Sequence, residues 1–296
     1  MSQHADEASL ISEPEWGRRS IRWSVGGMQA LLLFGLVVFG LGPILWLAKG
    51  AISPTADTLS HPLALFPHGF AWHNMTEAWT NVRVARYFWN TVALALGSWA
   101  CQLIVATTGA YALSVLRPKY ARVITGMLLA TLFVPAVVLL VPLYVEIVKP
   151  PLIHHSFVDS YWAIWLPAGA SAFNVIIVKR FFDNLPREIF EAARIDGAGP
   201  FSLFFRIVLP LSKPILGVVS VFAVLASWKD FLWPLLVLAN PEIQPLSVRL
   251  PSIQSQTELG VFLAAMFIAC LVPIGGFLIF QRAFLRGSGL GGAIKG

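Results

Sequence analysis

The sequence has few charged residues and few cysteines for its length. Asp, Glu, Lys and Arg make up 12% of the 296 residues, whereas 57% are hydrophobic. A soluble domain carries about 25% charged residues, so this chain has too little polar surface to face water on all sides. We therefore expect most of it to lie in lipid. Cys101 and Cys270 both lie in apolar runs without metal-ligand spacing to a histidine, which is typical of small buried hydrophobes.

Several classes of site are also missing. The net charge is +6, but no basic cluster is interleaved with aromatic residues, so we expect no nucleic-acid partner. The chain has no G-x-x-x-x-G-K-[ST] loop, and we expect no nucleotide or other cofactor to bind to it. An enzyme acting within the membrane is disfavoured because Ser227 has no histidine in a neighbouring apolar run. Adjacent His154 and His155 lie near Asp159 but point apart, which favours a solvated loop over a metal site.

Long apolar runs dominate what remains. A span needs about 20 mostly apolar residues to cross roughly 30 Å of hydrocarbon. Six runs meet this criterion, near 26–48, 89–115, 122–144, 160–179, 214–238 and 259–281. The sequence therefore predicts an all-α polytopic membrane protein with six transmembrane helices. We expect tails at 1–24 and 282–296 around a transmembrane domain at 25–281.

The positions of Lys and Arg predict the orientation of these spans. Fifteen of the 21 lie in one set of connecting segments, five lie in the opposite set, and Lys229 lies within a span. Because cytoplasmic loops carry the excess of basic residues, both termini and the loop at 183–213 are predicted to be cytoplasmic.

The sequence of the loop at 183–213 predicts two short helices joined by a turn. Pro186 suits a helix start because its missing N–H would have no partner there. Gly197 suits the end of this helix because glycine adopts the left-handed conformation without strain. A second helix is predicted from Pro200 to Pro210.

The first of these helices carries charges and small residues. Arg187, Glu191 and Arg194 are spaced for ion pairs along one side. Ala192 and Ala193 predict a flat face on which another protein can seat closely.

The loop resembles a motif of a known family. Glu191-Ala192-Ala193 is followed after three residues by Gly197, after nine more by Ile207, and after one more by Leu209-Pro210. Their identity and spacing resemble the EAA loop of permease subunits of ABC importers. The resemblance implies that these residues form a coupling helix that docks into a cleft on a separate ATPase subunit. It also implies that Glu191 pairs with a basic group there, and that a β-branched residue at position 197 uncouples ATP hydrolysis from uptake.

Two further stretches resemble the carbohydrate-uptake branch of that family. They are Trp228-Lys229-Asp230-Phe231-Leu232-Trp233-Pro234 in the fifth predicted span, and Phe280-Gln281-Arg282 with Gly289–Gly296 at the end of the chain. Lys229 departs from the family, which usually has Asn there, and the tail departs from the common Gly-Leu-Thr-Ala-Gly-Ala-Val.

This resemblance, nearest to the maltose-type second permease, implies a type I ABC importer permease fold in a bacterial-type cell membrane. It implies four kinds of partner: a second permease, a dimer of ATPase subunits that use ATP and Mg, an extracytoplasmic substrate-binding protein, and a carbohydrate substrate.

Polar and aromatic side chains within the spans are candidates for the substrate path, because polar groups are costly in hydrocarbon. The candidates are Asn174, Trp228, Lys229, Asp230 and Trp233, with Gln102, Thr107 and Thr108 as further hydrogen-bonding groups. The two indoles are expected to stack on sugar rings. The alternative for any of these residues is a structural bridge between helices.

Other transporters remain open at this point. The substrate is alternatively a glycerol-phosphate or a polyol, since such importers share this type of subunit. A more remote alternative is a proton-coupled secondary transporter that uses Lys229 and Asp230, although the two halves of the chain show no convincing internal repeat.

Overall fold

The computed structural model describes residues 19–151 and 154–288, and every regular element in these ranges is a helix. In chain order the α-helices are α2 (Arg19–Ala51), α3 (Thr55–Ser60), α4 (His73–Thr80), α5 (Val84–Tyr111), α6 (Ala121–Thr131), α7 (Leu140–Val148), α8 (Trp162–Gly169), α9 (Ala172–Asp183), α10 (Arg187–Ile195), α11 (Pro200–Leu203), α12 (Leu209–Leu211), α13 (Lys213–Lys229), α14 (Leu232–Val237), α15 (Leu246–Ile253) and α16 (Leu259–Ser288). Short π-helical turns continue α5 at Ala112–Leu116 and join α11 to α12 at Phe204–Val208. Short 3-10 turns lie at Ala136–Leu139, Pro241–Ile243 and Gln254–Gln256.

Among the described residues, three helical segments are long and apolar enough to cross a membrane, and up to six if each bent pair counts as one span. The single segments are Val25–Ala51, Val84–Leu116 and Leu259–Gly276. The bent pairs are Ala121–Thr131 with Ala136–Val148, Trp162–Gly169 with Ala172–Asp183, and Pro200–Leu211 with Lys213–Lys229. The number of predicted spans is thus compatible with the structure, but the third bent pair includes α11 and α12, which lie in the loop predicted to be cytoplasmic.

The fifth predicted span, 214–238, is not one continuous helix. Its helix α13 ends at Lys229, Asp230 is extended, and α14 begins only at Leu232. Pro234 gives the reason, because it has no N–H to donate to the carbonyl four residues back, at Asp230. The hydroxyl of Ser247 donates to that carbonyl at 2.6 Å instead, which stabilises the break.

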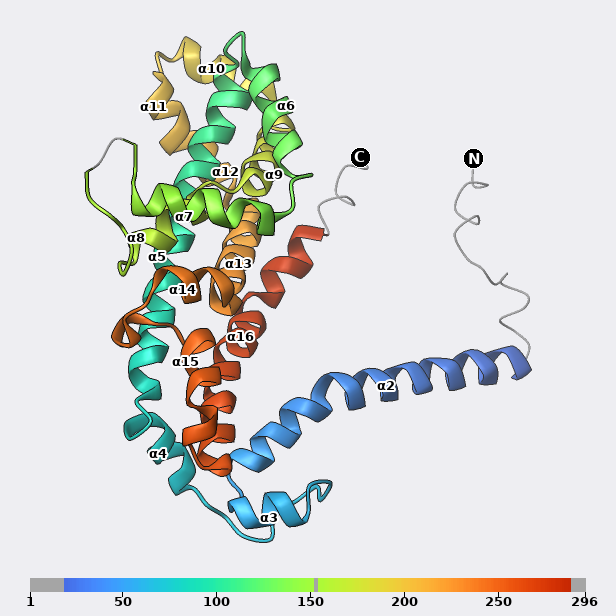
Figure 1. Cartoon of the computed structure of the whole chain (residues 1–296). Helices are drawn as coiled ribbons and strands as arrows, with labels where there is room; N and C mark the ends of the chain where they lie inside the picture. The colour runs from blue at the N-terminus through green and yellow to red at the C-terminus, as the bar shows by residue number, and fades with distance from the viewer. Residues whose placement is uncertain (1–18, 152–153, 289–296) are drawn as a thin grey trace.

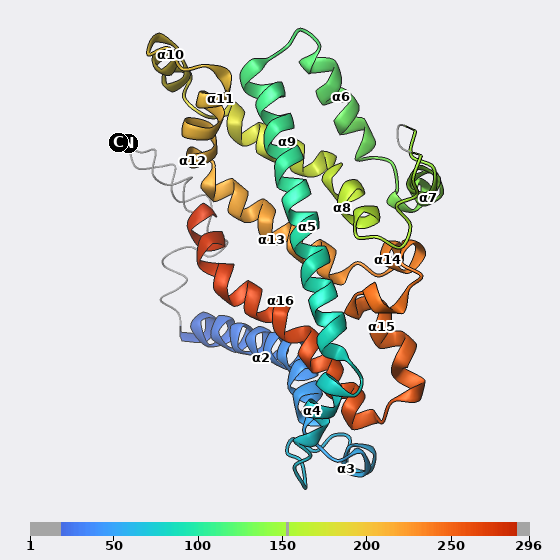
Figure 2. The ribbon, with the colours of Figure 1, turned by 90° about the vertical axis from the view of Figure 1, so that its left-hand side faces the viewer.

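Helix α5 is the central element, with α8, α9 and α13 packed along it (Figure 2). Helices α10, α11 and α12 lie at one end of the molecule, whereas α3 and α4 lie at the opposite end (Figures 1 and 2). The loop at 183–213 and the segment that connects α2 to α5 therefore lie at opposite ends of the molecule.

Helix α2 leans away from the other helices and meets the body near its α3 end, where it packs against α16 (Figure 1). Large apolar side chains are exposed along its length, among them Leu31, Phe34 and Phe39. A helix that is apolar on all sides needs lipid or another membrane protein around it. The prediction that this run is buried in the membrane fits that exposure.

The first and last long helices extend into the predicted tails, while the apolar spans themselves lie within 25–276. Helix α2 begins at Arg19, within the predicted tail 1–24, and α16 continues to Ser288, beyond the predicted end of the domain at 281. The remaining parts of both predicted tails, 1–18 and 289–296, lie outside the described residues, as does the family-like segment Gly289–Gly296.

Candidate functional site

The turn after α10 is built as the sequence predicts. Residue 187 opens the helix directly after Pro186, and Gly197 has φ +80°, in the left-handed region. The N–H of Ala198 donates to the carbonyl of Ala193 at 2.9 Å, and the N–H of Gly197 donates to that of Arg194 at 3.0 Å. These two bonds form a Schellman motif, in which a glycine satisfies the last carbonyls of a helix. The prediction that Gly197 ends this helix is confirmed.

The second helix of the loop ends later than predicted. Pro210 lies inside α12, which runs to Leu211, so the prediction that Pro210 closes the helix is wrong. The π-helical turn at Phe204–Val208 precedes this proline and changes the hydrogen-bond spacing where the N–H is missing. The bend comes at Ser212, whose hydroxyl donates to the carbonyl of Val208 at 2.6 Å.

The loop is anchored to the body through its apolar face. Phe190, Ala193, Phe204 and Val208 are buried in one cluster with the end of α9. The hydroxyl of Tyr111 in α5 donates to the carbonyl of Pro200 at 2.8 Å, and its ring packs 5.0 Å from that of Phe204. These contacts hold α10 and α11 against two long helices.

The predicted flat alanine face is only half available. Ala192 is exposed, but Ala193 faces the apolar cluster of its own chain and is buried, because the helix needs this position for its own packing. Large apolar side chains are outward-facing instead: Ile195 is 86% exposed, Phe201 80% and Phe205 60%. Ile207 and Leu209 pack against the cluster beneath them.

The predicted ion pairs within α10 do not form among the described residues: no salt bridge joins Glu191 to Arg187 or Arg194. The three side chains line a small pocket of about 200 Å³ instead, which they share with Arg117 and Asp183. Their spacing permits contact, but the exposed side chains are not held together by packing.

The charged network at this end lies one element earlier, at Asp183. Its carboxylate accepts from the ammonium of Lys179 at 2.7 Å and from the hydroxyl of Ser114 at 2.6 Å, and Arg117 lies 3.7 Å away. This network fixes the end of α9 to the end of α5. The i,i+4 spacing of Lys179 and Asp183 is the sequence signal that identifies it.

A larger cavity lies at the break in the fifth span. Its volume is about 640 Å³, and it is lined by Ser98, Gln102, Ile164, Pro167, Ala168, Ala226, Ser227, Lys229, Asp230, Phe231, Leu232 and Trp233. The cavity combines apolar surface with an ammonium, a carboxylate, an amide and two hydroxyls. Small-molecule sites commonly have this composition, with a few polar groups on a largely apolar wall.

Three of the five predicted substrate-path residues meet in this cavity, namely Lys229, Asp230 and Trp233. Asn174 does not line it. Its amide donates to the side-chain oxygen of Gln102 at 2.7 Å in a buried bridge between α9 and α5, so the structural alternative describes Asn174 better. Gln102 itself does reach the cavity wall.

The two tryptophans have the structural role that was the alternative for each of them, because each bridges two helices. Trp233 donates from Nε1 to the carbonyl of Ala163 at 2.9 Å, and Trp228 donates from Nε1 to that of Ala269 at 3.3 Å. Each carbonyl lies four residues before a proline, Pro167 in α8 or Pro273 in α16, and so lacks its helical donor. Each indole thus replaces a hydrogen bond that a proline removes from a neighbouring helix.

The expectation that Trp228 stacks on substrate is not supported by its position. Its indole is buried, lies edge-on to Phe88 with centroids 5.8 Å apart, and borders an apolar groove on the other side of α13. Thr107 and Thr108 donate to carbonyls of their own helix and add nothing to the cavity. Sequence reasoning missed Phe231 and Leu232, which become cavity residues only because the helix breaks there.

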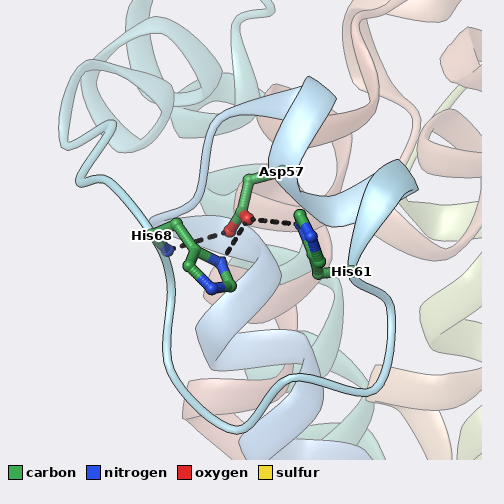
Figure 3. Close-up of side chains that lie close together, drawn as sticks. All are labelled: Asp57, His61 and His68. Atoms are coloured by element: carbon green, nitrogen blue, oxygen red, sulfur yellow. Dashed lines mark hydrogen bonds and ion pairs between the residues drawn. The ribbon is translucent and has the colours of Figure 1, made fainter.

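Asp159, between α7 and α8, supports the interpretation of that segment as a loop. Its carboxylate accepts from the backbone N–H of Asn240 at 2.8 Å, while His154 and His155 are exposed. A carboxylate–histidine cluster lies elsewhere, at Asp57, His61 and His68 in the segment between α2 and α4 (Figure 3). Only the i,i+4 spacing of Asp57 and His61 could have indicated it from the sequence.

The sequence of this chain is similar to those of known transport proteins. The family described as binding-protein-dependent transport system inner membrane component matches residues 103–286. The arabinooligosaccharides transport system permease protein AraQ of Bacillus subtilis (strain 168) is 31% identical over 285 residues, which cover 94% of this chain and 99% of AraQ. The sn-glycerol-3-phosphate transport system permease protein UgpE of Pectobacterium atrosepticum is 30% identical over 266 residues, covering 85% and 93% of the two chains.

The fold is also found in a solved structure. A chain from the crystal structure of a bacterial ABC transporter involved in the import of the acidic polysaccharide alginate matches with a TM-score of 0.78 at 21% identity. The match covers 90% of this chain and 98% of the other. The arrangement of helices is therefore shared along nearly the whole length of both.

Proposed function

Because the chain belongs to the family of inner membrane components of binding-protein-dependent transport systems, it is a permease subunit of an ABC importer, and we propose that it forms half of a translocation pathway for a sugar or oligosaccharide. The observation that carries the proposal is the cavity at the broken fifth span, with Lys229, Asp230 and Trp233 in its wall. The names of two relatives, AraQ and the diacetylchitobiose uptake permease NgcG of Streptomyces coelicolor, support a carbohydrate.

A second substrate class has a specific observation in its favour. The relative UgpE is named for sn-glycerol-3-phosphate, and the ammonium of Lys229 in the cavity wall offers a charge for a phosphate group. Asp230 in the same wall opposes an anion, which is why we propose the neutral carbohydrate first.

We propose that the cavity opens to one side of the membrane at a time under the control of ATPase subunits that bind ATP and Mg. In this proposal α10 and α11 dock onto the ATPase through the exposed side chains of Ile195, Phe201 and Phe205, with Glu191 and Ala192 at the same face. Exposed apolar side chains of this size at a water-facing end of a protein mark an interaction surface. Gly197, Ile207, Leu209 and Pro210 then act from within, by fixing the shape of the turn and its seat on the body.

The second permease subunit and the binding protein are proposed because this chain alone does not enclose the cavity. One chain forms only part of the wall around the cavity, and α2 is apolar on all sides, so we propose a second permease subunit and lipid around it. An extracytoplasmic binding protein would deliver substrate at the α3 end. Both termini and the α10 end are proposed to be cytoplasmic, on the basis of the excess of Lys and Arg in those segments.

Reconstitution tests the function directly. The chain is co-expressed with candidate second permeases and ATPases of its own genome, and the purified complex is placed in proteoliposomes with a candidate binding protein. ATP hydrolysis stimulated by one neutral sugar of a panel, with uptake of that sugar, supports the proposal. Stimulation by glycerol-3-phosphate alone supports the second substrate class. Uptake that needs a proton gradient and no ATPase would overturn the ATP-driven mechanism.

Cross-linking tests the docking surface separately. In a variant in which Cys101 and Cys270 are replaced by alanine, Ile195→Cys is expected to cross-link to the ATPase in the assembled complex. His154→Cys is the matched control: it is also exposed but lies between α7 and α8, and it should not cross-link to the ATPase. Cross-linking of the control to the ATPase, or of neither position, would contradict the proposed orientation and interface.

A further inference from the structure

Three potential metal ligands lie together in the segment between α2 and α4, at the end of the molecule opposite α10 (Figures 1 and 3). Oδ1 of Asp57 lies 2.7 Å from Nδ1 of His68 and 3.4 Å from Nδ1 of His61. The two imidazole rings are tilted by 44° to each other, with centroids 4.6 Å apart. Each residue offers one ligand atom, and these three atoms all lie within 4.8 Å of one another.

The local fold explains why these residues meet. Asp57 lies in the first turn of α3, which begins directly after Pro54, and His61 follows one helical turn later as the residue that caps the end of this helix. The chain then turns back, and the backbone N–H of His68 donates to Oδ2 of Asp57 at 3.2 Å. The carboxylate therefore fixes both the ring and the backbone of a residue eleven positions further along the chain.

Neighbouring helices hold this segment in place. The ammonium of Lys49 donates to the carbonyl of His61 at 3.0 Å, and Nε1 of Trp46 donates to the carbonyl of Pro62 at 2.7 Å. Thr55 donates from its hydroxyl to Glu258 at 2.6 Å and accepts from the N–H of Gly260 at 3.1 Å. The segment is thus tied to the end of α2 and the start of α16, and a ligand bound there would act on a held backbone.

The donor set suits one class of ion. Imidazole nitrogens, which are borderline donors, and carboxylate oxygens, which are hard donors, both bind Zn²⁺ at about 2.0–2.2 Å, and a tetrahedral site with three protein ligands keeps a fourth position for water. The Asp57 side chain is 8% exposed, whereas those of His61 and His68 are 57% and 63% exposed. The carboxylate is therefore the fixed ligand, and the two rings have room to adjust around an ion.

We propose that Asp57, His61 and His68 form a binding site for a divalent transition-metal ion, with Zn²⁺ as the best fit, which staples the segment between α2 and α4. The ion takes the place of the hydrogen bond between Oδ1 of Asp57 and Nδ1 of His68 and bonds to one nitrogen of each ring. The ammonium of Lys49 disfavours a cation here, but it is directed to the carbonyl of His61 and leaves the three ligand atoms free. The site does not depend on the transported substrate.

Metal titration of the full-length chain in detergent tests the proposal, with an affinity tag that contains no histidine. Co²⁺ is the spectroscopic probe, and one equivalent per chain should give the absorption bands of a four-coordinate site, which Zn²⁺ then abolishes. His61→Ala and His68→Ala should each lower the affinity at least about tenfold, since loss of even an outer partner of a metal ligand costs 10–100-fold. Asp57→Asn, which keeps the shape of the side chain, should do the same.

The variant His154→Ala with His155→Ala is the matched control, because it removes two exposed histidines from another loop and should bind Co²⁺ like the wild type. Zn²⁺ should also slow proteolysis within residues 54–72 of the wild type and not of His68→Ala. Equal Co²⁺ binding by the wild type and the His61→Ala, His68→Ala double variant would overturn the proposal. Loss of binding in the control would also overturn it. Neither result bears on transport, which is measured separately.

Discussion

Replacement of Gly197 tests whether the shape of the turn after α10 matters by itself. Gly197 has φ +80°, and a Cβ added to it would meet no atom within 4 Å. Any effect of a side chain at this position therefore comes from the backbone conformation and not from a clash. The left-handed conformation costs an L-residue roughly 1–2 kcal/mol, and more for a β-branched one.

This free-energy cost is large enough to change which conformation of the turn is populated. A penalty of 1–2 kcal/mol lowers the population of the native turn relative to alternatives by a factor of about 5–30. If φ changes, the bonds from Ala198 to Ala193 and from Gly197 to Arg194 are lost, and α11 is displaced relative to α10. Gly197→Val should therefore separate the two parts of the surface that we propose to contact the ATPase.

The assay is the ratio of substrate taken up to ATP hydrolysed in proteoliposomes that contain the assembled importer. We expect this ratio to fall at least about fivefold for Gly197→Val, which corresponds to about 1 kcal/mol. Gly197→Asn is the matched control, because asparagine tolerates the left-handed conformation, and it should stay near the wild type.

Two results would refute the reasoning. An unchanged ratio for Gly197→Val shows that the turn conformation is not needed for coupling. Equal damage by valine and asparagine shows that the side chain, and not φ, causes the defect.

Three further predictions follow from packing and from the cavity. Gly97→Ala should destabilise the chain by about 1–3 kcal/mol, because the added Cβ would lie 2.1 Å from the indole of Trp165. The measurement is the midpoint of thermal unfolding in detergent, which should fall. An unchanged midpoint would contradict the packing of α5 on α8. Asn174→Leu should cost about 1–3 kcal/mol by leaving the buried oxygen of Gln102 without a donor, and the same unfolding measurement should show partial recovery when Gln102→Leu is added. Lys229→Met should lower uptake at low substrate concentration roughly tenfold or more, by loss of a charged hydrogen bond of about 1.5–3 kcal/mol; uptake equal to wild type would remove Lys229 from the substrate path.

Matched variants separate these effects from general damage. Gly126→Ala adds the same methyl group to a helix at a position with open space, so it should leave the unfolding midpoint near the wild-type value. Lys229→Arg keeps the charge in the cavity and should retain more uptake than Lys229→Met. Failure of the first control would show that any added methyl group destabilises the chain in detergent.

The sequence was sufficient for features with a strong local cause. Pro186 and Gly197 fixed the ends of α10 because each acts through its own backbone, whatever surrounds it. The long apolar runs were sufficient for an all-helical membrane chain. They gave no information on the bends of 103°, 42° and 77°, since hydropathy averages over a break of a few residues.

The candidate site was harder to predict for the same physical reason. Asp230, Phe231 and Leu232 line the cavity because the helix stops there, and the hydroxyl of Ser247 from a later segment stabilises this break. Pro234 was the available signal. The Asp57–His68 contact spans a turn with no periodic pattern, so only the structure shows it.

The indoles that bond to the carbonyls of Ala163 and Ala269 have a consequence for how this chain tolerates change. Each hydrogen bond links a helix that contains a proline to a tryptophan of another helix. Replacing either residue alone would therefore leave a buried polar group without a hydrogen-bond partner. If Pro167 or Pro273 is replaced by a residue with a backbone N–H, that N–H can bond to the carbonyl and the indole N–H loses its acceptor. If the tryptophan is replaced by a smaller residue, the carbonyl oxygen loses its donor. We therefore expect each proline to vary together with its tryptophan partner, Pro167 with Trp233 and Pro273 with Trp228.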